Sequence, residues 1–179
     1  MSEYRYSQLS LTTIRLLRLL PSEKDQKPLR CELFEYPLQN SGKSSHPYEA
    51  LSYVWGSEDK PETITINDHS LNITQNLYTV LLHLRDHACS RIIWVDAICI
   101  DQADEKEKGH QIQFMAAIFA KANRVIVWLG EAQEDSDQAL RSIRIAGERS
   151  TKPSNVEQFQ RAILQLLKRS WFRRIWVRN

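Results

Sequence analysis

Residues 92–100 read IIWVDAICI, and every residue in this run except Asp96 is apolar. Continuous apolar runs rich in β-branched residues are typical of a strand that is covered on both faces of a sheet. We therefore predict a central strand over Ile92–Ile100 and place the other elements relative to it.

The segments on either side of this strand alternate between strand and helix patterns. Upstream, Tyr48–Trp55 predicts a buried strand that Gly56 ends. Downstream, helical spacing predicts a helix over Asp104–Ala122, followed by an apolar strand over Val125–Leu129. Strand, helix and strand in succession predict parallel strands in one sheet. The residues that we expect to be buried together are Trp94, Val95, Ile98, Ile112, Met115, Phe119, Ile126 and Val127.

Shorter β-rich segments precede the central strand. Leu11–Leu20 and Leu29–Tyr36 predict a pair of strands near the N-terminus. Thr63–Ile66 and Ser70–Ile73 predict a hairpin, because the turn residues 67–69 read NDH and two of them tolerate a left-handed backbone.

The whole pattern predicts an α/β fold. Its sheet is mixed and largely parallel, with helices on both faces and an N-terminal β-hairpin addition. A helix capped by Thr74 or Asn76 separates the second hairpin from the central strand. We expect residues 1–10 to form an N-terminal tail and residues 11–179 to form one domain.

Composition limits the possible functions. Lys and Arg total 24 against 22 Asp and Glu, and the net charge of +2 gives no field that would attract nucleic acid or an anionic membrane. The sequence has no secretory signal pattern and no apolar run of the ~18 residues that span a bilayer. Cys31, Cys89 and Cys99 are odd in number and widely spaced, which indicates a reducing compartment. We therefore expect a cytoplasmic protein.

Four short blocks of the sequence stand out. They are residues 48–56 (YEALSYVWG), 73–77 (ITQNL), 93–102 (IWVDAICIDQ) and 170–177 (SWFRRIWV). In this order, the blocks resemble those that define the fungal heterokaryon-incompatibility (HET) domain family, and the resemblance covers nearly everything from Leu11 onward. It implies a module of self/non-self recognition, or vegetative incompatibility, that promotes cell death through protein partners or self-association.

HET domains are in turn similar in their sequence order to Toll/interleukin-1 receptor (TIR) domains. These have a flavodoxin-like sheet, and some of them cleave NAD at its nicotinamide glycosidic bond. The resemblance places the TIR catalytic glutamate at or just after Val177, where this sequence has Arg178 and Asn179. HET sequences usually continue beyond the last block, so we expect a domain that is truncated at its C-terminal end and lacks this glutamate.

Two aspartates near the end of the predicted central strand are candidates for a ligand site. Asp101 lies where open α/β sheets bind ligands and is a weak candidate for a catalytic carboxylate; the alternative is that it caps the next helix. Asp96 lies inside the apolar run and needs a partner, for which Arg173 and Arg174 are the candidates.

Tyr53, Trp55 and Gly56 end the neighbouring predicted strand. Trp55 would stack on a ligand ring and Gly56 would let a ligand approach the backbone, unless the aromatic residues only pack the strand end. Gln102 would orient the ligand or lie on the surface as an ordinary amide. Glu49, at the start of the same strand, has no predicted catalytic role.

Other chemistry has no support in the sequence. The histidines and cysteines lack the short intervals of a zinc site, and the five glycines form neither a phosphate-binding loop nor a nucleophile elbow. Glu105 and Glu107 alternate with Lys106 and Lys108, which predicts a solvated helix face. We therefore expect no metal site and no cofactor.

Two functions from different classes remain. A signalling module would associate with itself or with a partner domain. A TIR-like NAD glycohydrolase would take NAD as its substrate and would need a carboxylate beside the ribosyl centre, which this chain would have to recruit from Asp101 or elsewhere. An inactive, truncated family member is a third alternative. The absence of the expected glutamate favours a protein that is not an enzyme.

Overall fold

The computed structural model describes residues 1–22, 28–38, 46–132, 137, 140–141, 143–144 and 156–173. The chain divides into two compact units, Met1–Val127 and Trp128–Asn179.

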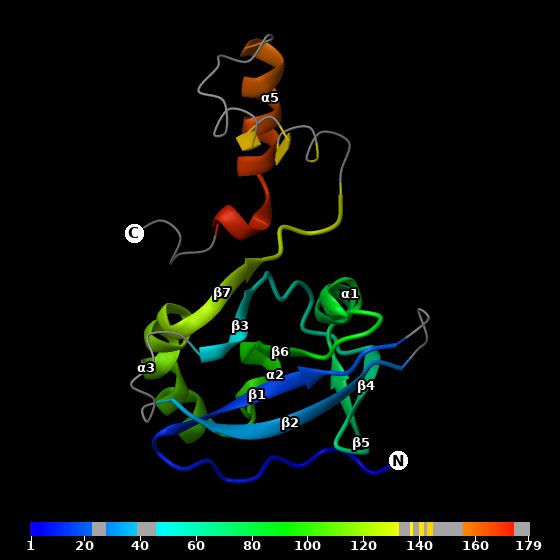
Figure 1. Cartoon of the computed structure of the whole chain (residues 1–179), viewed down its shortest axis with the longest axis vertical. Coiled ribbons are helices and arrows are strands. Elements are labelled where there is room, and N and C mark those ends of the chain that lie inside the picture. Colours follow the sequence, from blue (N-terminus) through cyan, green and yellow to red (C-terminus); the bar gives the residue numbers. More distant parts are fainter. Residues whose placement is uncertain are drawn as a thin grey trace. The chain divides into compact units, whose positions relative to one another are not determined.

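In the described part of the first unit, seven strands form one mixed sheet in the order β5-β4-β2-β1-β6-β3-β7 (Figure 1). Their bounds are β1 (Thr13–Leu19), β2 (Arg30–Pro37), β3 (His46–Ser52), β4 (Glu62–Ile66), β5 (His69–Ile73), β6 (Arg91–Trp94) and β7 (Ala122–Val127). β3 is parallel to both β6 and β7, and β2 is parallel to β4. The pairs β1–β2, β1–β6 and β4–β5 are antiparallel. The predicted α/β fold with a mixed sheet is confirmed.

β3, β6 and β7 form the parallel part of the sheet, as the strand-helix-strand pattern predicts. β3 comes first along the chain and lies between the other two, which is also how a doubly wound flavodoxin-like sheet begins. The predicted helix between β6 and β7 is α3 (Glu105–Lys121). Because the three strands are parallel, their carboxyl ends lie at one edge of the sheet.

β1 is the strand around which the first unit is built. Ile14, Arg15, Leu16 and Leu17 are consecutive, and each is at most 1% exposed, so both faces of the sheet are covered at this strand. β1 pairs with β2 on one side and with β6 on the other. The predicted N-terminal pair of strands therefore lies inside the sheet, where it joins the parallel strands to the β4–β5 hairpin.

The β4–β5 hairpin confirms the prediction made from its turn residues. Asn67 and Asp68 have positive φ angles of 47° and 63°, as a two-residue type I′ turn requires. The Asn67 side chain donates to the Leu33 carbonyl oxygen at 3.0 Å and accepts from the Leu33 amide at 3.1 Å. This paired contact fastens the turn to β2.

The apolar run Ile92–Ile100 is not a single strand, and this prediction is wrong beyond Trp94. β6 ends there, and a short helix, α2 (Asp96–Cys99), follows. At the start of α2, the Asp96 carboxylate accepts a hydrogen bond from the Ala97 amide at 2.8 Å and remains partly exposed. An interior strand position would have buried this carboxylate, and apolar periodicity does not distinguish a buried strand from a buried helical turn.

The two longer helices of the first unit have side-chain caps. α1 (Gln75–Leu84) begins behind Thr74, whose hydroxyl accepts from the Leu77 amide at 3.3 Å. Asp104 caps α3 and accepts from the Lys106 and Glu107 amides at 2.9 and 3.1 Å. The alternative prediction that Asp101 caps α3 is wrong, because Asp101 accepts from the Ala103 amide, before the helix.

The predicted buried face of α3 is partly wrong. Ile118 is fully buried, and the ring of Phe119 packs edge-on against Trp94 with centroids 5.6 Å apart. Ile112, however, is 53% exposed, and the position facing the sheet is taken by Gln111, which is 1% exposed and donates to the Thr13 carbonyl oxygen at 3.0 Å. A polar residue that satisfies a backbone carbonyl in the core interrupts the apolar periodicity.

The rest of the predicted buried set divides in the same way. Trp94, Val95 and Ile98 are each at most 1% exposed, whereas Val127 is 41% exposed. Val127 belongs to β7, the last strand in the order of the described sheet. An edge strand has a neighbour on one side only, so its apolar residues are less covered than those of a central strand.

In the second unit, described elements include α5 (Val156–Leu167) and a 3-10 turn, Ser170–Arg173. Leu166 is buried against Leu129 and Phe172. The Arg169 guanidinium donates to the carbonyl oxygens of Leu129 and Glu131, at 3.2 and 3.0 Å. No helix in the described part of the chain is long and apolar enough to cross a membrane.

Two isoleucines on α3 test the observed phase of this helix. Ile118→Ala should lower the free energy of unfolding by about 2–5 kcal/mol, because it leaves a cavity in the core. Ile112→Ala should change it by less than about 0.5 kcal/mol, because this side chain is largely solvated. Urea denaturation of the two variants measures the difference. Equal losses, or a larger loss for Ile112→Ala, would contradict the phase.

Candidate functional site

Several predicted site residues meet at the carboxyl edge of the parallel strands. The Trp55 indole Nε1 donates to both carboxylate oxygens of Asp96, at 3.3 and 3.2 Å. Gln102 Nε2 donates to the backbone carbonyl oxygen of Asp96 at 2.9 Å. Trp55 and Gly56 follow β3, whereas Asp96 and Gln102 follow β6. We name Trp55, Gly56, Asn76, Asp96 and Gln102 the carboxyl-edge cluster.

Gly56 and Asn76 shape the chain beside Trp55. Gly56 has a φ angle of +76°, which side-chain-bearing residues rarely adopt, whereas a Cβ there would meet Asn76 only at an ordinary 3.7 Å. Conformation rather than space therefore requires glycine at this position. Asn76 Nδ2 donates to the Val54 carbonyl oxygen and so ties the first turn of α1 to the end of β3.

The cluster presents an immobilised aromatic surface. The indole N–H of Trp55 donates to Asp96, which holds the ring in one orientation. Because Trp55 is 37% exposed, part of the ring is available to a ligand or a partner side chain. Tyr53, in contrast, is 1% exposed and packs inside, as the alternative prediction for the aromatic residues expected. Trp55 is thus the aromatic residue at this strand end that is free to stack.

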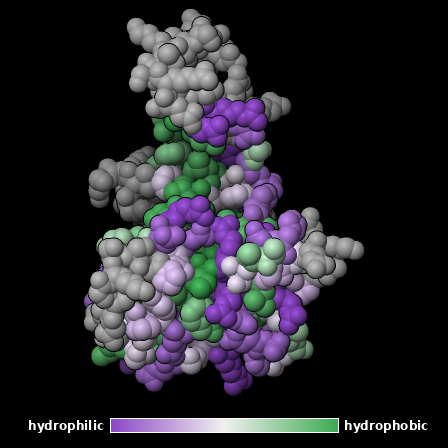
Figure 2. All heavy atoms as spheres, viewed as in Figure 1, coloured by the Kyte–Doolittle hydropathy of each residue, from purple (hydrophilic) through white to green (hydrophobic). Residues whose placement is uncertain are grey.

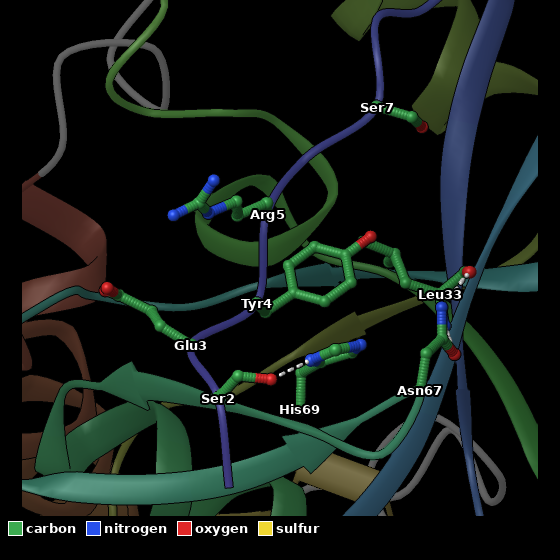
Figure 3. A pocket seen from close by; sticks show the side chains of 8 residues that line it. All are labelled: Ser2, Glu3, Tyr4, Arg5, Ser7, Leu33, Asn67 and His69. Atoms are coloured by element: carbon green, nitrogen blue, oxygen red, sulfur yellow. Dashed lines mark hydrogen bonds between the residues drawn. The ribbon is translucent and has the colours of Figure 1, made fainter.

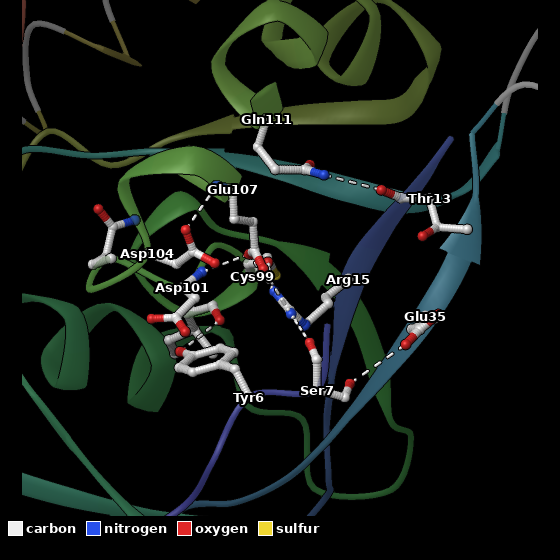
Figure 4. A network of polar contacts seen from close by, with 12 residues as sticks. Tyr6, Ser7, Thr13, Arg15, Glu35, Cys99, Asp101, Asp104, Glu107 and Gln111 are labelled. Carbon is white, nitrogen blue, oxygen red and sulfur yellow. Dashed lines mark hydrogen bonds and ion pairs between the residues drawn. The ribbon is translucent and has the colours of Figure 1, made fainter. Parts of the chain in front are cut away.

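Asp101 lies in a different cluster, centred on Arg15 (Figure 4). Its amide donates to Glu107 Oε1 at 2.8 Å, and its carboxylate accepts from the Ala103 amide at 3.0 Å. Arg15 binds Glu107 with both terminal nitrogens, at 2.5 and 2.9 Å, and also donates to the carbonyl oxygens of Cys99 and Ser7. One guanidinium therefore connects β1, α2, α3 and the N-terminal segment.

The charges in this cluster are mutually stabilised. Burial by itself lowers the pKa of Arg15, but the hydrogen bond and the charge of Glu107 outweigh it, so the pKa of Arg15 is raised. Tyr6 packs over the guanidinium with its ring centroid 4.9 Å away. Burial raises the pKa of Tyr6, which keeps its hydroxyl protonated as the donor to the Ile98 carbonyl oxygen at 2.9 Å.

Two predictions about charged residues need correction or stay open. Glu107 is not part of a solvated helix face, because its side chain is 10% exposed and paired with Arg15. Arg173 is exposed in the second unit, and Arg174 lies outside the described residues. The pairing of Asp96 with either arginine therefore remains a prediction.

The cysteines are not part of either cluster's chemistry. Cys31 and Cys99 are buried, and burial raises the pKa of each thiol to about 12, which keeps both protonated and unreactive. Cys89 is exposed. Among the residues that the structure describes, no group of three His, Cys, Asp or Glu side chains is placed to hold a metal ion.

A third polar cluster spans the parallel strands at Glu49. Its carboxylate accepts from Arg91 Nε at 2.9 Å and from Arg124 Nε at 2.8 Å, so it links β3 to β6 and to β7. Partial burial acts to raise the pKa of Glu49, but the hydrogen bonds and charges of Arg124 and Arg91 dominate, and the pKa is lowered. Glu49, for which no catalytic role is predicted, is thus an internal bridge across three strands.

Sequence reasoning missed the residues that hold the candidate site in place. Arg15 interrupts the apolar run of β1, and a charge at such a position signals a buried partner. Its partner Glu107 is 92 residues away, so no local pattern identifies the pair. Tyr6 and Ser7 belong to the segment that we expected to be an N-terminal tail, and they carried no signal.

Comparisons with known proteins bear on the same segments. The family model described as "Heterokaryon incompatibility protein (HET)" matches residues 48–179. A curated relative, "Heterokaryon incompatibility protein 6, OR allele" of Neurospora crassa, is 35% identical over 150 residues, which cover 76% of this chain and 22% of the relative. The chain thus spans about a fifth of the length of that relative. No solved structure matches the chain.

Replacing Glu49 by glutamine tests the bridge across the parallel strands. Near neutral pH, Glu49→Gln should lower the free energy of unfolding by about 1–3 kcal/mol, because it removes charge-assisted hydrogen bonds while keeping the shape of the side chain. Because the folded-state pKa of Glu49 is lowered, its ionic contribution is complete above the unfolded-state pKa. That contribution is lost as the pH falls through the folded-state pKa.

Urea unfolding of both proteins between about pH 3 and pH 7 measures this dependence. The difference between wild type and Glu49→Gln should shrink toward acid pH. A difference that stays constant, or grows, as the pH falls would contradict an ionic role for Glu49.

Proposed function

Because the chain belongs to the HET family, we propose that it acts in heterokaryon incompatibility as a signalling module that promotes cell death by associating with a protein partner or with a second copy. The family match over residues 48–179 and the named Neurospora crassa relative support the role in incompatibility. The module works in the cytoplasm, which agrees with free cysteines at positions 31, 89 and 99.

The observation that supports association with another protein is the exposed apolar surface of α5. Leu164 and Leu167 are 58% and 50% exposed, whereas Leu166 is 6% exposed and packs within the second unit. Leu164 and Leu167 are three residues apart and therefore lie on one side of the helix. Leu140 and Ile143, in the same unit, are also more than 40% exposed.

Such exposure is the usual property of a surface that binds another protein. Single exposed apolar residues are common, but contiguous exposed patches mark interaction sites. On the face seen in Figure 2, hydrophobic residues reach the surface in patches between hydrophilic ones. Exposed leucines on one side of a helix give a partner apolar contact area of the kind found at the centre of specific interfaces.

A second candidate function is cleavage of NAD, and the carboxyl-edge cluster is the observation that favours it. Trp55 is fixed and partly exposed at the edge where open α/β sheets bind nucleotides. The two candidate carboxylates, however, accept internal hydrogen bonds: Asp96 accepts from Trp55 and Ala97, and Asp101, in the Arg15 network, accepts from Ala103. The proposed site therefore suits binding better than stabilisation of a ribosyl cation.

A charge placed on the exposed side of α5 tests association. Leu164→Glu should abolish, or reduce at least about tenfold, both self-association in light scattering and cell death when the full chain is expressed in fungal hyphae, because it buries a charge in the interface. Gln165→Glu is the matched control, because it adds the same charge at the next residue of the helix, where the side chain is also exposed. It should leave both readouts unchanged.

Equal effects of the two variants would show that added charge, and not the leucine surface, is responsible. Cell death that persists undiminished in Leu164→Glu would contradict the proposal that this surface transmits the signal.

The enzyme alternative is tested by nicotinamide release from NAD by the purified chain. We expect no release from the wild type or from Asp101→Ala, because the Asp96 carboxylate already accepts from Trp55 and Ala97 and Asp101 belongs to the Arg15 network. Release by the wild type that disappears in Asp101→Ala would assign the catalytic role to Asp101. Release that survives the substitution would identify an enzyme that uses another carboxylate.

A further inference from the structure

Residues Ser2–Ser7 form an extended arm that is anchored to β5 at one end. The Tyr4 amide donates to the Ser70 carbonyl oxygen at 2.8 Å, and the Ser70 amide donates to the Ser2 carbonyl oxygen at 2.9 Å. The Ser2 hydroxyl and His69 Nδ1 are also hydrogen-bonded, at 2.8 Å (Figure 3). The arm thus lies along β5 like a short additional strand.

One side of the arm is exposed to solvent. A hollow of about 600 Å³ lies beside it, lined by the arm itself and by Leu33, Asn67 and His69 (Figure 3). Ser2, Glu3 and Arg5 are exposed. Tyr4 and Tyr6, which alternate with these residues, are half-buried. A segment with one solvated side that is held by hydrogen bonds at the sheet edge opens at a lower free energy than the core on which it rests.

The other end of the arm contacts α2 and Arg15. The Tyr6 hydroxyl donates to the Ile98 carbonyl oxygen of α2, and the Ser7 carbonyl oxygen accepts from Arg15. Arg15 holds Glu107, and Glu107 accepts from the Asp101 amide (Figure 4). Asp101 belongs to residues 100–104, which connect α2 to α3 and which we name the Asp101 loop.

From this loop, the contacts continue to the exposed indole. Gln102, the residue after Asp101, donates to the Asp96 carbonyl oxygen, and the Asp96 carboxylate accepts from the Trp55 indole. Contiguous polar contacts therefore connect the arm to Trp55. Since the arm also contacts α2 directly, both routes end at the helix that begins with Asp96.

We infer that the N-terminal arm is a latch that, while docked, holds the residues of the carboxyl-edge cluster in their observed positions. While the arm is docked, α2 and the Asp101 loop are held, and Trp55 is fixed on Asp96. When the arm lifts, Arg15 loses the Ser7 carbonyl oxygen. Its Nε already has no hydrogen-bond partner among the described residues, so its buried guanidinium must find new partners.

The loop that Arg15 holds through Glu107 then moves, and Trp55 is released. Two arrangements of one network therefore couple the arm to the site. This coupling is independent of the proposed function, because it concerns how the cluster is held and not what the cluster binds.

Tyr6→Ala tests the latch in the full chain, with Ile64→Val in the β4–β5 hairpin as a control that also lowers stability. NMR reports the Asp101 amide and the Trp55 indole N–H, which is identified by its loss in Trp55→Phe. Tyr6→Ala should speed hydrogen exchange of the Asp101 amide by ~10-fold or more relative to the control, after correction for global stability, and should shift the Trp55 indole resonance.

Tyr6→Phe loses only the hydroxyl and should show the same changes at smaller amplitude, which keeps the test decisive if Tyr6→Ala does not fold. Because coupling is reciprocal, Asp96→Asn should in turn speed exchange of the Tyr4 amide. Asp101 exchange and a Trp55 resonance that match the control in both Tyr6 variants would overturn the latch and leave the arm a passive cover.

Discussion

The buried guanidinium of Arg15 is the constraint on which the first unit depends. It lies in β1, where four consecutive residues are buried. An unpaired charge there would lower the free energy of unfolding by several kcal/mol. Its hydrogen-bond partners come from the N-terminal segment, α2 and α3. The fold therefore has to bring these separate segments to one point, and the position of the Asp101 loop is a result of that requirement.

This constraint also changes where the physical domain begins. The family match starts at residue 48, yet β1 precedes it and pairs with β6 inside the matched segment. Arg15, from outside the match, supplies the charge that Glu107 needs inside it. The residues before 48 are thus part of the same core, and removing them would leave one hydrogen-bonding edge of β6 unpaired and the Glu107 carboxylate without its partner.

Features set by local chemistry were predictable from the sequence, and features set by distant contacts were not. The Asn67-Asp68 turn and the Thr74 cap follow from what these residues do within a few positions of the chain. The ends of β6 and the phase of α3 depend on tertiary contacts. Asp96 begins a helix because its carboxylate needs donors, and Gln111 is buried because the Thr13 carbonyl oxygen needs one.

The candidate site likewise has residues that the sequence predicted and residues that depend on tertiary contacts. The sequence placed Trp55, Gly56, Asp96 and Gln102 near two strand ends, and the structure brings these residues together. The sequence also predicted Asp101 at this place. In the structure, α2 separates Asp101 from Asp96 along the chain, and the Asp101 amide donates to Glu107 in the Arg15 network. The helical turn between Asp96 and Asp101, which apolar periodicity hides, is the physical reason for the difference.

Native-state hydrogen exchange of the unmodified chain, measured against denaturant concentration, tests the central claim that the arm and the Asp101 loop open as one unit. The amides of Tyr4 and Asp101 should share one opening free energy and one denaturant dependence, both below those of the β1–β6 ladder. If Asp101 exchanges only with the ladder while Tyr4 exchanges earlier, the loop is held without the arm, and the account is contradicted.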